Sequence, residues 1–197
     1  MNYYAKFNFT SFLNIVDALG GVTVDIPKYK VYGNNDGVFT TVKGNYTMKP
    51  GVMEMNAKQA LAFVRERKSF IEGVTIRGKN QMLMFKSILK KCISPSIIVK
   101  MDGVFEALSG SFETNMSSDD IKSLINMQID DMSSWDIVSY SLKGDASHRA
   151  LEFATVGNIS KVNKKGLYVT DPDQKSIEKA KEYIQTIMND EILKIED

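Results

Sequence analysis

The stretch YYAKFNFTSFLNIVDALGGVTVDIP, residues 3–27, decides the fold class. Residues 3–9 alternate and are rich in aromatic side chains, which is typical of a strand. Residues 10–21 carry apolar side chains at helical spacing and end on two glycines. Residues 22–27 form a short β-branched run that proline closes. A strand, a helix and a strand in direct succession predict a βαβ unit, and therefore a sheet that is at least partly parallel.

The rest of the chain mixes helical patterns with short strand-like runs. Residues 28–37 are loop-like and residues 38–48 resemble a hairpin or edge excursion. A strand is expected over residues 134–144, and helices are expected over residues 57–67, 75–92, 94–112, 117–133 and 171–190. Asn56 is expected to cap the first of these helices. Since no repeat, low-complexity tract or linker interrupts these patterns, they predict one α/β domain over residues 1–197.

Composition narrows the class of protein. The 197 residues are 43% hydrophobic and 25% charged, as in an ordinary globular protein. A net charge of only +1 argues against a general nucleic-acid binder. The single cysteine, Cys92, excludes an internal disulfide and is expected to be a small buried side chain. No run approaches the roughly 18 apolar residues that cross a bilayer, so this chain alone is predicted to be soluble.

A basic cluster stands out in RERKSFIEGVTIRGKNQ, residues 65–81. On a helix through this region, Arg77 and Gln81 share one face near the N-terminus, where free N–H groups favour an anion. Arg65 and Arg67 end the preceding helix and could point back toward the same place. Guanidinium groups that converge there would suit a phosphate or pyrophosphate through forked hydrogen bonds.

An ordinary surface explains the same cluster. Basic side chains around a helix–loop–helix junction are commonly solvated, and Glu66 could pair with the arginines in surface ion pairs of little energetic weight. The anion site has one more argument in its favour: Gly73, in the intervening loop, would permit a close backbone approach to the anion. The residues alone leave both interpretations open.

Five motifs resemble one known family. They come in the order and at about the spacing seen in the LytR-CpsA-Psr family of Gram-positive bacteria, and the resemblance covers essentially the whole chain. Each motif is weak alone, but the combination is specific: FLNIVDALGGVTVDIP, ALAFVRERK, RGKNQ, SPSII and GLYVTDPD.

The resemblance implies a membrane-anchored phosphotransferase on the extracellular face of the cell membrane. Such proteins take a glycopolymer (teichoic acid, capsular polysaccharide or similar) from a polyprenyl pyrophosphate carrier and attach it to peptidoglycan. The implied fold is a three-layer α/β/α sandwich with a mixed, partly parallel sheet. An apolar tunnel would hold the prenyl tail, and arginines at its mouth would hold the pyrophosphate, usually with Mg²⁺.

The family's motif residues can be placed on this sequence. The resemblance implies that the pyrophosphate is bound by Arg65, Arg67, Arg77 and Gln81. Lys79 and Asn80 match a subfamily variant and would have a supporting role.

This sequence departs from the family at two points. The family usually has Gly-Asp where this chain has Gly73-Val74, so the catalytic residue is unknown and activity is in doubt. The family's first strands, with an Asp/Arg motif, and its membrane helix would precede Met1. This chain is therefore expected to be N-terminally truncated, to contain no metal ligand, and to leave a sheet edge or an apolar face uncovered.

Several points stay open at this stage. The protein could bind polyprenyl phosphate or a glycan lipid without transferring it, or it could be a cell-envelope-related transcriptional attenuator, although nothing indicates DNA binding. The run MLMF, residues 82–85, could line a prenyl tunnel or pack in the core. His148 lies in a stretch that resembles a loop, and a solvated side chain is the expected state.

Overall fold

The computed structural model describes residues 3–98, 104, 112–131, 137–149, 167–189, 191 and 193. The chain divides into two compact units, Met1–Ile137 and Val138–Asp197. The single domain over residues 1–197 stays a prediction.

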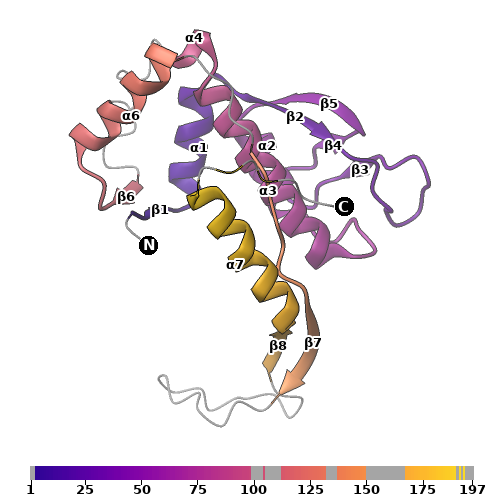
Figure 1. Ribbon diagram of the computed structural model, residues 1–197. Coiled ribbons are helices and arrows are strands. Elements are labelled where there is room, and N and C mark those ends of the chain that lie inside the picture. Colours follow the sequence, from indigo (N-terminus) through magenta and orange to yellow (C-terminus); the bar gives the residue numbers. More distant parts are fainter. Residues whose placement is uncertain are drawn as a thin grey trace, which may run out of the picture. The chain divides into compact units, whose positions relative to one another are not determined.

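The first unit mixes helices with short strands, which confirms the α/β class (Figure 1). Its elements are, in chain order, β1 (Ala5–Phe7), α1 (Phe9–Ala18), β2 (Val22–Ile26), β3 (Phe39–Thr40), β4 (Thr47–Met48), β5 (Gly51–Met55), α2 (Ala57–Arg65), α3 (Gly73–Cys92), α4 (Pro95–Ile98), β6 (Phe112–Thr114) and α6 (Ser118–Asp131).

Strand pairing in this unit corrects the expected parallel arrangement. β1 pairs with β6, β2 with β5, and β3 with β4, and all three pairings are antiparallel. Strand β5, which the sequence analysis did not predict, lies in register with β2 from Val22 opposite Met55 to Ile26 opposite Gly51. The strand–helix–strand order is present, but β1 and β2 have other partners, because tertiary packing and not chain order selects the neighbour of a strand.

The β2–β5 sheet is open at its edges. Among the described strands, β2 and β5 pair only with each other, so each has an outer edge without a partner. Val52 of β5 is 75% exposed. An uncovered sheet edge and exposed apolar side chains, as expected from the sequence, are therefore present.

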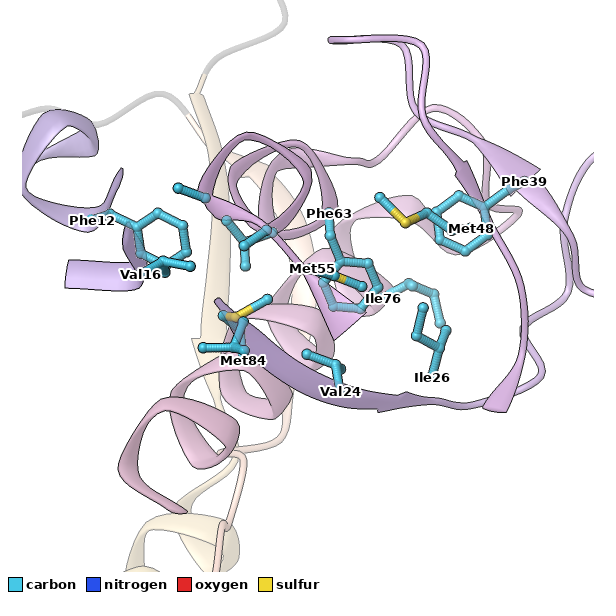
Figure 2. Packing of buried hydrophobic residues seen from close by; sticks show 14 of the residues in the cluster. Phe12, Val16, Val24, Ile26, Phe39, Met48, Met55, Phe63, Ile76 and Met84 are labelled. Carbon is cyan, nitrogen blue, oxygen red and sulfur yellow. The ribbon is translucent and has the colours of Figure 1, made fainter. Parts of the chain in front are cut away.

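The core of the first unit lies between α1, α2, α3 and the β2–β5 sheet (Figure 2). Figure 2 shows side chains from all of these elements in one cluster, which continues to Phe39 and Met48 of the β3–β4 hairpin. Full burial of one such side chain stabilises the fold by about 1.5–3 kcal/mol. The largest fully buried apolar side chains are Val16, Val24, Ile26, Met48, Met55, Phe63, Phe70 and Met84.

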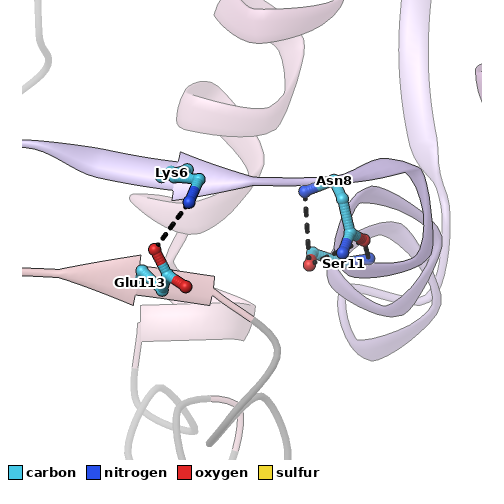
Figure 3. Close-up of polar contacts among 4 residues, drawn as sticks. All are labelled: Lys6, Asn8, Ser11 and Glu113. Carbon is cyan, nitrogen blue, oxygen red and sulfur yellow. Dashed lines mark hydrogen bonds and ion pairs between the residues drawn. The ribbon is translucent and has the colours of Figure 1, made fainter.

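Helices α1 and α2 both begin at an asparagine capping box. The Asn8 side chain accepts the Ser11 N–H at 2.9 Å, and the Ser11 hydroxyl oxygen accepts the Asn8 N–H at 3.5 Å (Figure 3). Asn56 and Gln59 make the same two bonds at 3.0 Å, which confirms the predicted cap. These caps satisfy backbone donors that a helix start would otherwise leave unpaired.

A lysine–glutamate pair crosses the β1–β6 ladder. Lys6 Nζ lies 2.9 Å from Glu113 Oε2 (Figure 3). Both side chains are well exposed, so the pair adds little to stability.

Several helix predictions need correction at their ends. The helix expected over residues 171–190 starts at Gln174, because Asp171 and Pro172 lie in a strand, and α3 starts at Gly73, which was expected in a loop. The helix expected over residues 57–67 ends at Arg65, which leaves Arg67 in the following loop. The helix expected over residues 94–112 begins as α4, but Phe112 lies in β6, and residues 99–103 and 105–111 lie outside the described residues. Cys92, at the end of α3, is partly buried as expected, and burial raises the pKa of its thiol.

The second unit holds β7 (Gly144–Arg149), β8 (Leu167–Pro172) and α7 (Gln174–Met188). β7 and β8 form an antiparallel pair. The strand predicted over residues 134–144 is wrong for the described residues, because residues 137–143 are irregular and only Gly144 belongs to β7; residues 134–136 lie outside the described residues. His148 lies in β7 and not in a loop. Tyr183 of α7 packs edge-to-face on Tyr140 at 5.2 Å between ring centroids.

No helix in the described part of the chain combines the length and the apolar character that crossing a bilayer demands.

Candidate anion-binding site

Four residues singled out from the sequence line one pocket. Arg65, Arg67, Arg77 and Gln81 surround a space of about 480 Å³ between the C-terminal end of α2, the loop that follows it and the first turns of α3. We call this space the arginine pocket. The structure thus brings the predicted side chains together, whereas their binding of pyrophosphate stays a prediction.

Two further cations line the arginine pocket. Lys68 belongs to the loop after α2, and Lys43 belongs to the turn between β3 and β4. Glu66 is the one acid among the residues that line the pocket in the described part of the chain. The wall is therefore strongly cationic, although the chain as a whole is almost neutral.

Arg65 is held by an aromatic ring. Its Cζ atom lies 4.4 Å from the ring centroid of Phe9, the first residue of α1. A cation–π contact of this kind restricts the guanidinium while leaving its N–H groups free to face the pocket. Phe9 is itself 57% exposed, so the contact lies at the surface.

Glu66 organises the loop that carries Arg67. Only 3% of its surface is exposed. Its Oε1 accepts the backbone N–H groups of Arg67, Lys68 and Ser69 at 2.9, 2.7 and 3.1 Å, and its Oε2 accepts that of Val42 at 2.6 Å. Burial alone would raise the pKa of Glu66, but the four N–H bonds together outweigh it and lower the pKa. Glu66 is therefore a buried backbone-binding carboxylate and not a member of a surface ion pair.

Gly73 makes its close approach to the protein itself. A Cβ atom at this position would overlap the carbonyl oxygen of Arg67 and lie 2.8 Å from Arg67 Cγ. The sequence analysis expected the small residue to admit a bound anion. In the structure it admits the Arg67 backbone, because α3 starts directly against the loop.

The side chains of α3 also bind the end of α2. Asn80 Nδ2 lies 3.5 Å from the carbonyl oxygen of Phe63, and Gln81 Nε2 lies 3.4 Å from that of Val64. These carbonyls belong to the last turn of α2, where a helix supplies fewer donors than acceptors; the Phe63 oxygen also accepts the Glu66 N–H at 3.2 Å. Asn80 is fully buried and does not line the arginine pocket, so a supporting role would act through the contact between the two helices. Lys79 is exposed and also lies outside the pocket lining.

Val74 lies in the first turn of α3. It is 54% exposed, and its position is three residues before Arg77, on the same side of the helix. An aspartate here would be one helical turn from Arg77 and close to the helix N-terminus, where a negative charge is favoured.

An apolar groove of about 480 Å³ adjoins the arginine pocket. The pocket and the groove share Phe9, Val64 and Gln81. The groove is lined by Phe7, Asn8, Phe9, Phe12, Leu61, Val64, Gln81, Met84, Phe85 and Ile88.

The MLMF run divides between the groove and the core. Met84 is buried in the core cluster and also lines the groove, Phe85 lines the groove, and Leu83 packs against the core. Core packing is thus confirmed for Leu83 and Met84, whereas the prenyl tunnel stays a prediction.

The described residues do not fit a magnesium site. No group of three His, Cys, Asp or Glu side chains in the described part of the chain could hold a metal ion. The carboxylate of Glu66, in the pocket wall, is already bonded to four N–H groups.

Sequence reasoning missed four residues of the site. Phe9, Lys43, Glu66 and Lys68 line the pocket, and none was predicted to do so. Lys68 directly follows the R-x-R motif and could have been included on that ground. Lys43 carries no local signal, because only the folded chain brings the β3–β4 turn to the end of α2.

The fold and the site define an α/β protein with a cationic pocket beside an apolar groove. The chain belongs to the LytR_cpsA_psr family, whose model matches residues 1–186.

Curated relatives carry transferase names. One relative is the polyisoprenyl-teichoic acid–peptidoglycan teichoic acid transferase TagU of Bacillus licheniformis, to which the chain is 28% identical over 178 residues. The matched region covers 90% of this chain and 49% of that TagU. The chain is 34% identical over 119 residues to TagU of Bacillus mycoides, covering 60% of this chain and 36% of the relative. The chain thus spans about half or less of the length of these relatives.

Solved structures share the fold. B. subtilis TagV superposes with a TM-score of 0.71 at 22% identity, over 98% of this chain and 66% of TagV. A structure of TagT bound to LIIa-WTA superposes with a TM-score of 0.65 at 24% identity, over 93% of this chain and 60% of TagT.

Proposed function

We propose that the protein is a phosphotransferase that attaches a glycopolymer, such as teichoic acid or capsular polysaccharide, from a polyprenyl pyrophosphate carrier to peptidoglycan. The observation that carries the proposal is the junction of the arginine pocket with the apolar groove at Phe9, Val64 and Gln81. A diphosphate joined to a prenyl chain has the same two-part chemistry. The transferase names of the curated relatives support the same reaction class.

In the proposed complex, the guanidinium groups of Arg65, Arg67 and Arg77 bind the diphosphate through forked hydrogen bonds, and the Gln81 amide adds a donor. A peptidoglycan hydroxyl attacks the phosphorus that bears the glycan, and the P–O bond to the prenyl phosphate breaks. Catalysis by this chain is electrostatic, because the arginines stabilise the charge that develops on the transferring phosphoryl group and on the leaving prenyl phosphate. We derive no step through Mg²⁺, since the described residues do not fit it.

The groove accommodates the prenyl tail in this proposal. Met84 and Phe85 offer flexible and aromatic apolar surface that suits a branched hydrocarbon. Because such a carrier is a membrane lipid, we propose that the protein works at the extracellular face of the cell membrane.

Binding of geranyl pyrophosphate, a short soluble prenyl pyrophosphate, tests the proposal. Isothermal titration calorimetry should find binding to the parent protein, and Arg77→Ala should weaken it about 10- to 100-fold, the range expected for losing a hydrogen bond to a charged group. Lys90→Ala, an exposed change near the other end of α3, is the matched control. Equal affinities for Arg77→Ala and the parent would contradict the proposal.

A second candidate function is lipid binding without transfer, which Val74 favours because it replaces a potential acid one turn before Arg77. Under this alternative, the protein binds geranyl pyrophosphate but releases no phosphate in the presence of magnesium, and Val74→Asp gains release. Magnesium-dependent release by the parent protein would exclude the binding-only function.

A further inference from the structure

We infer that Glu66 is the positioning residue of the arginine pocket and that it places Lys43 there as a further ligand of the phosphorylated substrate. The inference deepens the proposed function and rests on it. It joins two elements that are far apart in the sequence, the β3–β4 turn and the loop after α2.

A short hydrogen bond from Glu66 connects these two elements directly beside Lys43. Glu66 Oε2 accepts the backbone N–H of Val42 at 2.6 Å, and Val42 directly precedes Lys43. Glu66 Oε1 binds the loop side through three further N–H groups. One buried carboxylate therefore fixes the backbone on both sides of the pocket.

The turn is also rigid in itself, so its attachment decides where Lys43 lies. The buried Thr41 hydroxyl donates to the carbonyl oxygen of Lys43 at 2.9 Å and accepts the Tyr46 N–H at 3.1 Å. The Ser69 hydroxyl donates to the carbonyl oxygen of Thr40 at 3.1 Å, which holds the same two elements together a second time. Lys43 then lines the pocket with the arginines.

The chemistry of the four N–H groups explains why this residue is a glutamate. Converging backbone N–H groups form an anion-binding nest, and an external phosphate could occupy it. Here the Glu66 carboxylate fills the nest, so the arginine and lysine side chains are left for the substrate. Lys43 is exposed and contributes as a mobile point charge, in contrast to the forked contacts of the arginines.

Replacing Glu66 by glutamine separates the two sides of the pocket. The amide oxygen can keep the three N–H bonds of residues 67–69, but the amide NH₂ then faces the Val42 N–H, and two donors meet. Glu66→Gln should therefore detach Val42 and Lys43 from the Arg67 loop, while the Ser69–Thr40 bond still holds β3, and it should weaken geranyl pyrophosphate binding by about as much as Lys43→Ala does. We expect about a fivefold loss for each variant, the upper range for an exposed ion pair.

A double-mutant cycle distinguishes positioning from general loss of structure. In the Glu66→Gln background, Lys43→Ala should cost almost nothing more, because Lys43 has already left the pocket. Lys49→Ala, directly after β4 and outside the pocket lining, is the control for charge, and circular dichroism checks that each variant folds.

The outcomes separate this inference from the proposed function. If the parent protein does not bind geranyl pyrophosphate, both fail. If binding falls with Arg77→Ala but not with Lys43→Ala, the proposed function stands and the inference is overturned. Additive losses for Glu66→Gln and Lys43→Ala would also overturn it. If Glu66→Gln does not fold, Glu66→Asp replaces it in the cycle. Lys43→Ala should again cost almost nothing more in that background, and an additive loss would again overturn the inference.

Discussion

Glu66 shows how one buried side chain can organise a binding surface without facing the ligand. It is almost fully enclosed, yet it is stabilised as an anion by four backbone donors. A buried carboxylate without partners would be costly, whereas hydrogen bonds to its charged form are the strongest that a protein backbone offers. Its carboxylate oxygens bond to backbone N–H groups, and it forms no ion pair with Arg65 or Arg67, the described arginines on either side of it.

We predict that the stability contribution of Glu66 depends on pH. Because its pKa is lower in the folded chain than in the unfolded chain, the contribution is present above the ordinary glutamate pKa of about 4.3 and is lost as pH falls through the folded value. The difference in unfolding free energy between the parent and Glu66→Gln, measured by urea denaturation, should therefore shrink from pH 7 to pH 3. A difference that stays constant over this range would contradict the assignment.

Gly73 and Gly78 provide a matched pair of predictions on one helix. Gly73→Ala should destabilise the protein by about 1–3 kcal/mol and weaken geranyl pyrophosphate binding, because the new Cβ collides with the Arg67 carbonyl. Gly78→Ala meets nothing within 4 Å and should stabilise α3 by about 0.5–1 kcal/mol. Thermal unfolding and calorimetric titration of both variants test this, and equal effects would rule out the close contact.

Helices α2 and α3 act together as the frame of the site. The first ends at Arg65, the second begins at Gly73, and the Asn80 and Gln81 amides bind the last carbonyls of the first. This contact fixes the offset between the helices, and hence the distance between the arginines at the end of one and the start of the other. Asn80 has a buried Oδ1 without a hydrogen-bond partner among the described residues, so the joint is only partly satisfied.

The capping box of α2 should carry measurable stability. Asn56→Ala removes the acceptor for the Gln59 N–H and should cost about 1 kcal/mol, while Asn56→Ser keeps an acceptor and should cost less. Chemical denaturation of the two variants provides the measurement. Identical losses would mean that the side-chain oxygen does not cap the helix.

Within the first unit, the site lies where a cationic surface meets an apolar one. The arginine pocket belongs to the ends of α2 and α3, and the apolar groove runs between α1, α2 and α3. The aromatic ring of Phe9 belongs to both, since it contacts Arg65 and lines the groove. A ligand with a charged head and an apolar tail would therefore contact both surfaces at once.

Met84 and Phe85 should separate stability from lipid binding. Met84 is buried, so Met84→Ala should destabilise the unit by about 2–5 kcal/mol. Phe85 is 48% exposed, so Phe85→Ala should leave stability nearly unchanged but weaken geranyl pyrophosphate binding, with no effect on inorganic pyrophosphate. Titration with both ligands tests the groove, and an equal loss for both would place Phe85 at the diphosphate instead.

Local patterns were enough to predict most helices and part of the site. Apolar spacing located α1, α2 and α3 to within a few residues, because burial of one helical face is written into the sequence. The i, i+4 relation of Arg77 and Gln81 likewise placed both at the start of α3. Strand β5 was missed, since a five-residue strand carries a weak signal and its partner is chosen only in the fold.

The sequence by itself determined the α/β class, the family and the identity of the four residues proposed to bind the diphosphate, because these depend on local periodicity and on motifs. Only the tertiary structure decided the antiparallel pairing of the strands, the burial of Glu66 and the arrival of Lys43 at the arginine pocket. The physical reason is that hydrogen bonds between distant backbone groups depend on how the chain packs, and no local pattern of side chains encodes them.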